Sequence, residues 1–562
     1  MSMRVAPTVP RPGSQVDRCN LWDSPLLRVR RRGEPAVLSL REIIRSAELI
    51  DGLDVALPTQ EVAILRQLLL PIVLEIFGPV RSEQDWVDRF RRGTFIGRPA
   101  DREALDAYEE EWRSRFDLFD PVAPFAQVGG LVSTKGELKT PAVLVPTCAT
   151  GNNVPLFAAV TENDPYSLSL PDAFVWLLHT HCWDTAAIKT GAAGDPAVRQ
   201  GKTTGNPVGA LGGLGVVVSG GANLFETLML NTPIVTDSGQ MGRPQWTRSP
   251  AGPQWRIRPA TGLLDLLTWQ SRRIRLVPEL RGSEMRVVGA LVAAGDRLEM
   301  VPGYEPHTLW RAAPAARGAS VVVPARHRPG RAAWRGLDSL LAVQSMAIDE
   351  AHSRTSMLLT QLADLQAGGA LPDDFPLQVL VCGMVYGNKS AVVEDVVADR
   401  IPMPILALSA DTEVRQVVLD CATQADELAT AVNLLEGDLR RCLAGEPTPW
   451  NKGERPGERL VQNLDRRVRA LLAALRHPPE PDFLESGRLA WEQVAWRETT
   501  AVADQVIAAF PPRVFRGHTD KSGRTVMREA DAHSRFNRRL RTTLPRAYEA
   551  LVKKEGHGQD PA

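Results

Sequence analysis

The sequence predicts an α+β fold, with a large mixed α/β N-terminal domain followed by a C-terminal four-helix bundle. Three observations support this prediction. In the first two thirds of the chain, short apolar runs alternate with glycine-rich stretches, as is typical of strands, helices and loops mixed in one domain. In the last third, four stripes of apolar residues recur at helical spacing. The 562 residues are 44% hydrophobic and 23% charged, which is an ordinary globular composition.

The N-terminal domain is expected to span residues 19–404, after a proline-rich leader, residues 1–18, that we expect to be disordered. Ser39 is the predicted N-cap of a helix reaching Leu53, because Glu42 completes a capping box with it. The glycine-rich stretch 190–221 is expected to form loops or to bring the backbone close to a ligand. Apolar spacing predicts three further elements, a helix over 59–77, a long helix over 337–366 and a strand over 377–385.

The predicted four-helix bundle spans residues 405–555, and residues 556–562 form a tail. Each of its four stripes repeats apolar residues at helical spacing, so each predicts a helix with one buried face. The stripes lie at 414–439, 460–475, 491–510 and 536–551. Amphipathic segments joined by short or medium loops are typical of a helical bundle.

Composition excludes several classes of protein. The 66 Lys and Arg residues are balanced by 66 Asp and Glu residues, so any positive charge that binds nucleic acid must be local. The six cysteines lie far apart without a C-x-x-C pair, which indicates a reduced, cytoplasmic protein with no disulfide framework and no zinc ribbon. No signal peptide is visible, and the most lipid-like run, 68–77, is too short to span a bilayer. We therefore expect a cytoplasmic protein without a membrane partner.

The most enzyme-like motif is Gly201-Lys202-Thr203, which is similar to the end of a phosphate-binding P-loop. A complete P-loop needs a glycine five residues before Gly201, and Pro196 stands there instead. A helix must also follow, and Pro207 disfavours one. A P-loop-like nucleotide hydrolase is therefore kept only as an alternative.

A second cluster, formed by His179, His181, Cys182 and Asp184, contains side chains that ligate metals. On a helix, alternate residues point apart, and no second ligand group with matching spacing follows. We predict that these side chains belong to the core, that the protein binds no metal or other cofactor, and that it has no catalytic residues.

Two features point to nucleic acid instead. Residues 513–546 carry ten basic and three acidic side chains, a local net charge of +7, which is the pattern of a phosphate-binding surface. A solvated helix face is the alternative interpretation of this basic strip. Glycines near Lys189, Arg199 and Lys202 would let backbone amides approach phosphates or base edges. The alternative for that segment is a flexible surface loop.

Five blocks of sequence, in order along the chain, resemble the CasA family, the large subunit of the type I-E CRISPR Cascade complex. The resemblance implies a non-catalytic subunit that recognises the protospacer-adjacent motif (PAM) in double-stranded DNA, promotes duplex opening and R-loop formation, and recruits a helicase-nuclease. Base pairing with the guide RNA then reads the rest of the target. The blocks are CNLWDSP at 19–25 with LSLRE at 38–42, RFDLFDP at 115–121 with PF at 124–125, NVPLF at 153–157, LTWQSRRI at 267–274, and GMVYGNK at 383–389 with DR at 399–400.

The same resemblance implies roles for individual residues. A glycine loop that enters the DNA minor groove corresponds to residues 190–194, with Lys189 beside it. A wedge that separates the strands corresponds to residues 388–390, although many members have glutamine where Ser390 stands. A basic finger corresponds to Arg297, and the cysteine-free segment 281–298 before and around it predicts no metal there. The implied DNA-binding residues are Lys189, Thr190, Gly191, Ala192, Ala193, Gly194, Asn388, Lys389, Ser390 and Arg297.

Two further surfaces complete the expectation. Residues 158–168 resemble a loop that docks against the guide RNA and a neighbouring subunit, and its candidate contacts are Asn153, Phe157, Thr161 and Asn163. The bundle residues Arg535, Arg538, Arg539 and Arg541 are candidates for non-specific DNA binding. The expected partners are the guide RNA, double-stranded target DNA, other Cascade subunits and a helicase-nuclease. A scaffold that binds only proteins is the remaining alternative.

Overall fold

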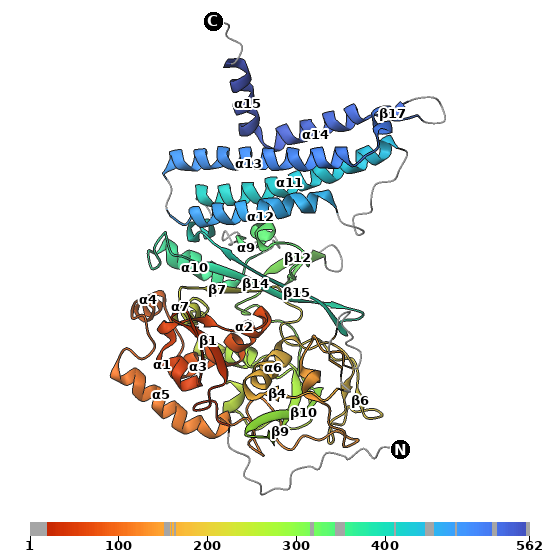
Figure 1. Ribbon diagram of the computed structural model, residues 1–562. Helices are drawn as coiled ribbons and strands as arrows, with labels where there is room; N and C mark the ends of the chain where they lie inside the picture. The colour runs from red at the N-terminus through yellow and green to blue at the C-terminus, as the bar shows by residue number, and fades with distance from the viewer. Residues whose placement is uncertain are drawn as a thin grey trace.

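The computed structural model describes residues 19–150, 158, 160–161, 164–314, 320–342, 354–409, 412–443, 455–477, 480–519 and 525–557. It contains several small sheets and many helices in its N-terminal part, followed by a layer of long helices. In Figure 1 this layer lies at the C-terminal end of the molecule, next to strands β14 and β15. The predicted fold class is confirmed. The predicted leader, residues 1–18, lies outside the described residues.

The first elements form a three-stranded sheet, order β2-β1-β3, with a capped helix beside it. The Ser39 side chain and Glu42 form the predicted capping box at the start of α1. The helix ends at Arg45, before the predicted end at Leu53, because the last residues of that segment pair with β1 as strand β3. The bounds are β1 Leu27–Arg31, β2 Glu34–Leu38, α1 Leu40–Arg45 and β3 Ile50–Leu53.

The predicted helix over 59–77 is confirmed, with one irregular turn. Helix α2 and helix α3 are joined by a π-helical turn at Leu65–Leu69, whose residues are buried. Within that turn Arg66 forms an ion pair with Glu305 in the core. The bounds are α2 Pro58–Ile64, α3 Leu70–Ile76, α4 Glu83–Arg91 and α5 Pro99–Trp112.

Two small sheets and several short strands surround the segment that carries the candidate site. Strands β9 and β10 form a long antiparallel pair, and β14 pairs with β15 on one side and β7 on the other. The predicted strand over 377–385 is thus the core of β14. The bounds are β4 Leu168–Ser169, α6 Leu170–Trp183, β5 Lys189–Thr190, β6 Lys202–Thr203, β7 Val216–Gly220, α7 Leu224–Leu230, β8 Ile257–Arg258, α8 Leu263–Leu267, β9 Arg272–Arg281, β10 Glu284–Ala294, β11 Arg297–Leu298, β12 Trp310–Pro314, β13 Ser320–Pro324, β14 Gln378–Gly387 and β15 Val392–Pro402.

The prediction of one long helix over 337–366 is wrong. The described residues contain a short helix, α9 (Leu337–Leu340), and a separate helix, α10 (Met357–Ala367). Ser356 has an extended backbone and its hydroxyl accepts from the amide of Leu359, so it begins a new helix. Ser356 is a strong N-cap within a run of regularly spaced apolar residues, so the apolar spacing alone did not reveal that a new helix begins there.

The C-terminal helices pack as predicted, except for the last. Helices α11 to α14 lie side by side in Figure 1, and their apolar stripes face one another. The fourth predicted stripe, 536–551, is divided between α14 and α15, because the backbone leaves helical geometry at Leu544 and Pro545 cannot continue an α-helical ladder. Helix α15 projects away from the layer and ends inside the segment predicted as a tail. The bounds are α11 Glu413–Cys442, α12 Pro456–Ala474, α13 Pro481–Ala508, β16 His518–Thr519, β17 Thr525–Met527, α14 Glu529–Thr543 and α15 Pro545–His557.

Among the described residues, no helix combines the length and the apolarity needed to cross a membrane.

Candidate nucleic-acid interface

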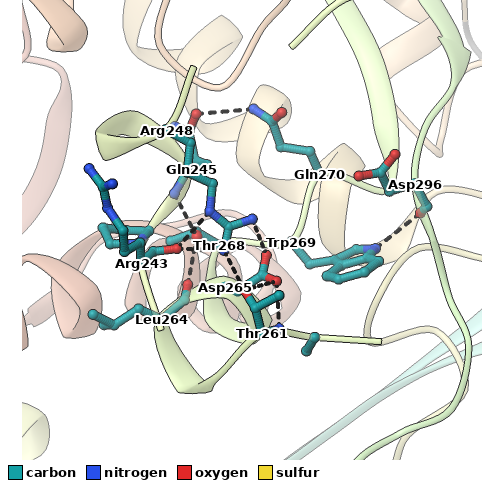
Figure 2. A network of polar contacts seen from close by, with 12 residues as sticks. Arg243, Gln245, Arg248, Thr261, Leu264, Asp265, Thr268, Trp269, Gln270 and Asp296 are labelled. Atoms are coloured by element: carbon teal, nitrogen blue, oxygen red, sulfur yellow. Dashed lines mark hydrogen bonds and ion pairs between the residues drawn. The ribbon is translucent and has the colours of Figure 1, made fainter. Parts of the chain in front are cut away.

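The block at residues 267–274 forms a polar network where α8 meets β9 (Figure 2). The indole Nε1 of Trp269 donates to the backbone oxygen of Asp296 at 3.0 Å. The Thr268 hydroxyl accepts from the amide of Gln245 at 3.0 Å, and the Gln270 side chain donates to the Gln245 side chain at 3.1 Å. These contacts fix the start of β9 against two loops that are remote in sequence.

Asp265 is the buried acid of this network. Its carboxylate accepts from Arg258 at 2.6 Å and from the amide of Thr261 at 2.8 Å, and it pairs with Arg248 at 2.7 Å. Burial alone would raise the pKa of Asp265, but the hydrogen bonds from Arg258 and Arg248 outweigh it and lower that pKa to about 2. The acid therefore stays charged and holds the loop that leads into α8.

The adjacent residues Arg272 and Arg273 point to two different acids. Arg273 pairs with Asp296 at 2.6 Å, immediately before Arg297. Arg272 pairs with Asp184 and also donates to the backbone oxygens of Thr185 and Pro207, at 2.9 and 2.8 Å. One short motif thus anchors both the candidate basic finger and the segment that leads into the glycine loop. Sequence reasoning missed this role, because it depends on partners 88 residues away.

Lys189 lies in the same buried cluster. Its ammonium contacts the Asp184 carboxylate at 2.6 Å, and the residue is only 8% exposed. Burial lowers the pKa of Lys189 to about 8, although Asp184 acts in the opposite direction. Burial would raise the pKa of Asp184, but Lys189 and Arg272 hold it below its usual value. This geometry favours a positioning role for Lys189 over direct contact with DNA.

The glycine loop, residues 190–194, begins at the last residue of β5, which forms a small hairpin with β6. The amide of Gly191 donates to Gly201 at 2.9 Å, and the oxygen of Gly191 accepts from Thr134 at 2.9 Å. Gly191 and Ala192 are buried, Thr190 and Ala193 are half-buried, and Gly194 is exposed with φ of +86°. Only the end of the loop therefore reaches the surface.

The hairpin tip between β14 and β15, residues 388–390, has an unusual backbone. Asn388, Lys389 and Ser390 all have positive φ, at 38°, 58° and 61°. Non-glycine residues rarely adopt this region, and clusters of such residues are typical of functional sites. Asn388 and Lys389 are exposed, whereas the oxygen of Ser390 accepts from the amide of Ala186 at 2.7 Å.

Arg297 lies at the other side of the β5–β6 hairpin. Its Nη2 donates to the backbone oxygen of Thr204 at 3.2 Å, directly after β6. Since Ser390 contacts Ala186, three residues before β5 begins, the hairpin tip and Arg297 are both tied to this hairpin. The glycine loop, the hairpin tip and the basic finger, which were predicted separately, are therefore assembled around β5 and β6.

The other predicted residues lie elsewhere. Asn153, Phe157 and Asn163 lie outside the described residues. Thr161 is exposed, and its amide and hydroxyl donate to the Asp164 carboxylate at 2.7 and 2.9 Å. That contact forms a local turn.

The bundle arginines form a second region, on α14 at the opposite end of Figure 1 from β6. Arg535 lies 3.9 Å from Asp438, and the guanidinium of Arg541 lies 4.8 Å from the ring centre of Tyr548. Arg538 and Arg539 line an open cleft of about 780 Å³ between α11 and α14. These residues do not contribute to the glycine-loop region.

The alternative sites do not have the geometry that their motifs require. Lys202 lies in the β6 strand, paired across a tight turn with Arg199, and the next helix, α7, begins only at Leu224. His179 contacts the Thr59 hydroxyl at 3.0 Å and His181 the oxygen of Ala126 at 2.8 Å. Burial lowers their pKa values to about 3 and about 4, so both are neutral core residues. Within the described ranges, no three potential metal ligands come together.

Comparisons with known proteins agree with the predicted resemblance. A family model described as CRISPR-associated protein Cse1 matches residues 20–502. The CRISPR-associated protein CasA/Cse1 of Thermus thermophilus is 26% identical over 450 residues, which cover 77% of this chain and 80% of that protein. The crystal structure of Thermobifida fusca Cse1 is similar with a TM-score of 0.79 at 29% identity, covering 94% of this chain and 99% of the other. The crystal structure of Cse1 from Acidimicrobium ferrooxidans is similar with a TM-score of 0.77 at 29% identity, covering 94% of this chain and 98% of the other.

Proposed function

Because the chain belongs to the Cse1 family of CRISPR-associated proteins, we propose that it is the PAM-reading large subunit of a type I-E Cascade complex. The resemblance to the CasA family that the sequence blocks predicted is confirmed. The observation that carries the proposal is the assembly of the glycine loop, the hairpin tip and Arg297 around one small hairpin. A compact backbone suits the narrow minor groove, and a basic side chain beside it suits the acceptors and phosphates of DNA.

In the proposed mechanism, Gly194 and the neighbouring backbone enter the minor groove at the PAM. Asn388, Lys389 and Ser390 then act as the wedge beside it. Their left-handed backbone projects the tip outward from the β14–β15 pair, and Ser390 fixes its base to Ala186. Strand separation at the PAM would let the guide RNA begin pairing with the target strand. The chain would itself catalyse no reaction.

The proposal is tested by reconstituting the complex with and without this chain. We expect the complete complex to bind duplexes that carry a PAM, selected from a randomised library, at least tenfold more tightly than duplexes without one. The incomplete complex should lose this preference. Equal binding with and without the chain would contradict the proposal and would favour a scaffold that binds only proteins. Release of inorganic phosphate from a nucleotide added to the same preparations would instead favour the hydrolase, provided that Lys202→Ala abolishes this release.

The proposal includes further partners. Residues around Thr161 would dock against the guide RNA and a neighbouring subunit, and the exposed face of the bundle would hold DNA without regard to sequence. Recruitment of a helicase-nuclease would follow once the duplex is open. These contacts would place one chain between the guide, the target and the other subunits of the complex.

Reversing the charges of Arg538, Arg539 and Arg541 to glutamate is expected to weaken DNA binding equally for PAM and non-PAM duplexes. Each phosphate contact that is lost should reduce the slope of log K against log salt concentration by about 0.9, so up to about 3 in total. The slope is measured by titrating the full complex at several salt concentrations. The triple variant Arg459→Glu, Arg466→Glu and Arg467→Glu on α12, where all three residues are exposed, changes the net charge by the same amount and is the control. An unchanged slope would show that the basic strip is a solvated helix face and not a DNA-binding surface.

A further inference from the structure

Arg297 differs from the arginines around it. Arg258, Arg272 and Arg273 each form an ion pair with a carboxylate. Arg297 forms no ion pair with any described residue. Its guanidinium instead lies over the indole ring of Trp255, with Cζ 3.7 Å from the ring centre. Burial lowers the pKa of Arg297 and repulsion from Arg272 adds to this effect, whereas Asp195, which forms no direct ion pair with it, acts in the opposite direction. The side chain remains charged at neutral pH because an arginine pKa starts so high.

The available donors of Arg297 follow from its hydrogen bonds. A guanidinium carries five N–H donors. Nη2 donates to Thr204, and Nε is buried with no partner among the described residues, so it cannot reach another molecule. The donors left for another molecule are therefore the remaining N–H groups of the two Nη nitrogens. The side chain is half-buried, so its outer edge reaches the surface. An arginine that is charged, stacked on a ring and not bonded directly to a carboxylate is arranged to meet acceptor atoms from another molecule.

The segment that carries Trp255 is held on both sides. Arg273 Nε donates to the oxygens of Gly252 and Gln254, at 3.0 and 3.1 Å. The Gln254 side chain donates to the oxygen of Gly194 at 3.1 Å, at the exposed end of the glycine loop. The amide of Arg297 donates to the oxygen of Arg256 at 2.9 Å. Trp255 therefore lies between the glycine loop and Arg297, on a segment bonded to both.

We propose that Trp255 is a positioning residue that holds the Arg297 guanidinium flat beside the glycine loop, so that its remaining Nη donors face acceptor atoms of bound duplex DNA. The inference rests on the proposed function and deepens it. Stacking on an aromatic ring restricts the plane of a guanidinium, and its N–H donors all lie in that plane. The ring thus determines the direction of the donors and leaves the charge in place. A carboxylate in the same position would neutralise that charge. The acceptors are either phosphate oxygens or base edges in the minor groove.

The test compares Trp255→Leu, which is apolar but smaller and has no aromatic face, with Trp255→Phe, which keeps an aromatic face. Both are assembled into the full complex with guide RNA and titrated with PAM and non-PAM duplexes. We expect Trp255→Leu to lose roughly fivefold to twentyfold in affinity for PAM duplexes and Trp255→Phe to recover most of that loss. Trp112→Ala removes a half-buried indole at the end of α5 and is the matched control, with PAM preference unchanged.

A double-variant cycle with Arg297→Ala separates positioning from a general structural role. If Trp255 acts through Arg297, Trp255→Leu should have no further effect once Arg297 is alanine. Additive effects, or identical affinities for the Leu and Phe variants, would overturn the inference. Loss confined to PAM duplexes identifies base edges as the acceptors, whereas equal loss on both duplexes with a lower salt slope identifies phosphates.

Failure of the inference and failure of the proposed function give different results. If the unmodified complex shows no PAM preference, the proposed function is wrong and the inference falls with it. If the unmodified complex prefers PAM duplexes and Trp255→Leu binds them equally well, only the inference is wrong. Thermal unfolding of each purified variant, compared with Trp112→Ala, shows whether a loss of affinity follows from a loss of folded protein.

Discussion

Replacing Gly191 by valine is expected to remove most of the PAM preference of the assembled complex. A Cβ atom at this position would lie 2.5 Å from Cγ1 of Val198 and 2.8 Å from the carbonyl carbon of Gly201. Gly201 is the hydrogen-bond partner of Gly191 across the hairpin, so the clash would push the two strands apart. Overpacking of this kind costs about 1–3 kcal/mol, which corresponds to roughly 5- to 150-fold in affinity if the glycine loop absorbs the displacement.

The control for this prediction is the same substitution at a glycine that has open space around it. Gly52 lies in β3, and a Cβ atom there would meet no atom within 4 Å. Gly52→Val should therefore leave both the unfolding temperature and PAM binding close to those of the unmodified chain. The measurement is a titration of PAM and non-PAM duplexes by each assembled complex. If Gly191→Val keeps the full PAM preference, the assignment of residues 190–194 to the minor groove is wrong.

The largest loss in the free energy of unfolding is expected when Asp184 is replaced by asparagine. Its carboxylate is the shared partner of Lys189 and Arg272, and these side chains are 9% and 1% exposed. Removing it leaves two buried cations without a counter-ion, which typically costs about 3–5 kcal/mol. Urea unfolding of the purified full chain measures this loss. Because Lys189 begins β5 and Arg272 begins β9, the damage should reach the glycine loop before the rest of the fold.

A surface ion pair provides the matched control for Asp184. Asp106 pairs with Arg45 at 2.6 Å, but the two side chains are 58% and 44% exposed. Asp106→Asn should therefore cost less than about 1 kcal/mol. Adding Lys189→Met to Asp184→Asn should recover part of the lost stability, because it removes one of the unpaired charges. Equal stability of the Asp184 and Asp106 variants would show that the buried cluster does not support the hairpin.

Local features of the fold could be predicted from the sequence. The capping box at Ser39 and the apolar stripes of α11, α12 and α13 depend on residues within a few positions of one another. The errors arose where a distant partner or a single backbone break decided the outcome. Residues 50–53 became a strand because β1 lies beside them, and Pro545 ended a stripe whose apolar spacing continued.

The candidate site was predictable only in part, for the same reason. The family resemblance predicted the glycine loop, the hairpin tip and Arg297 as separate segments, and their meeting around β5 and β6 depends on the tertiary fold. Nothing local indicated that Lys189 would be buried on Asp184, since a lysine beside a glycine loop usually lies in solvent. Trp255 lacked any motif, and its role emerges only from the side chain stacked on it.

If the hairpin tip at residues 388–390 acts as the proposed wedge, its backbone has a consequence for the kinetics of target recognition. Three successive left-handed residues cost about 1–3 kcal/mol each, and this cost is met once, when the chain folds. A tip that is already in its final shape loses no conformational entropy when it meets a duplex. Encounters with DNA would then be limited by orientation rather than by ordering of the tip, so the complex could examine and reject wrong sites quickly, with residence time alone distinguishing the correct one.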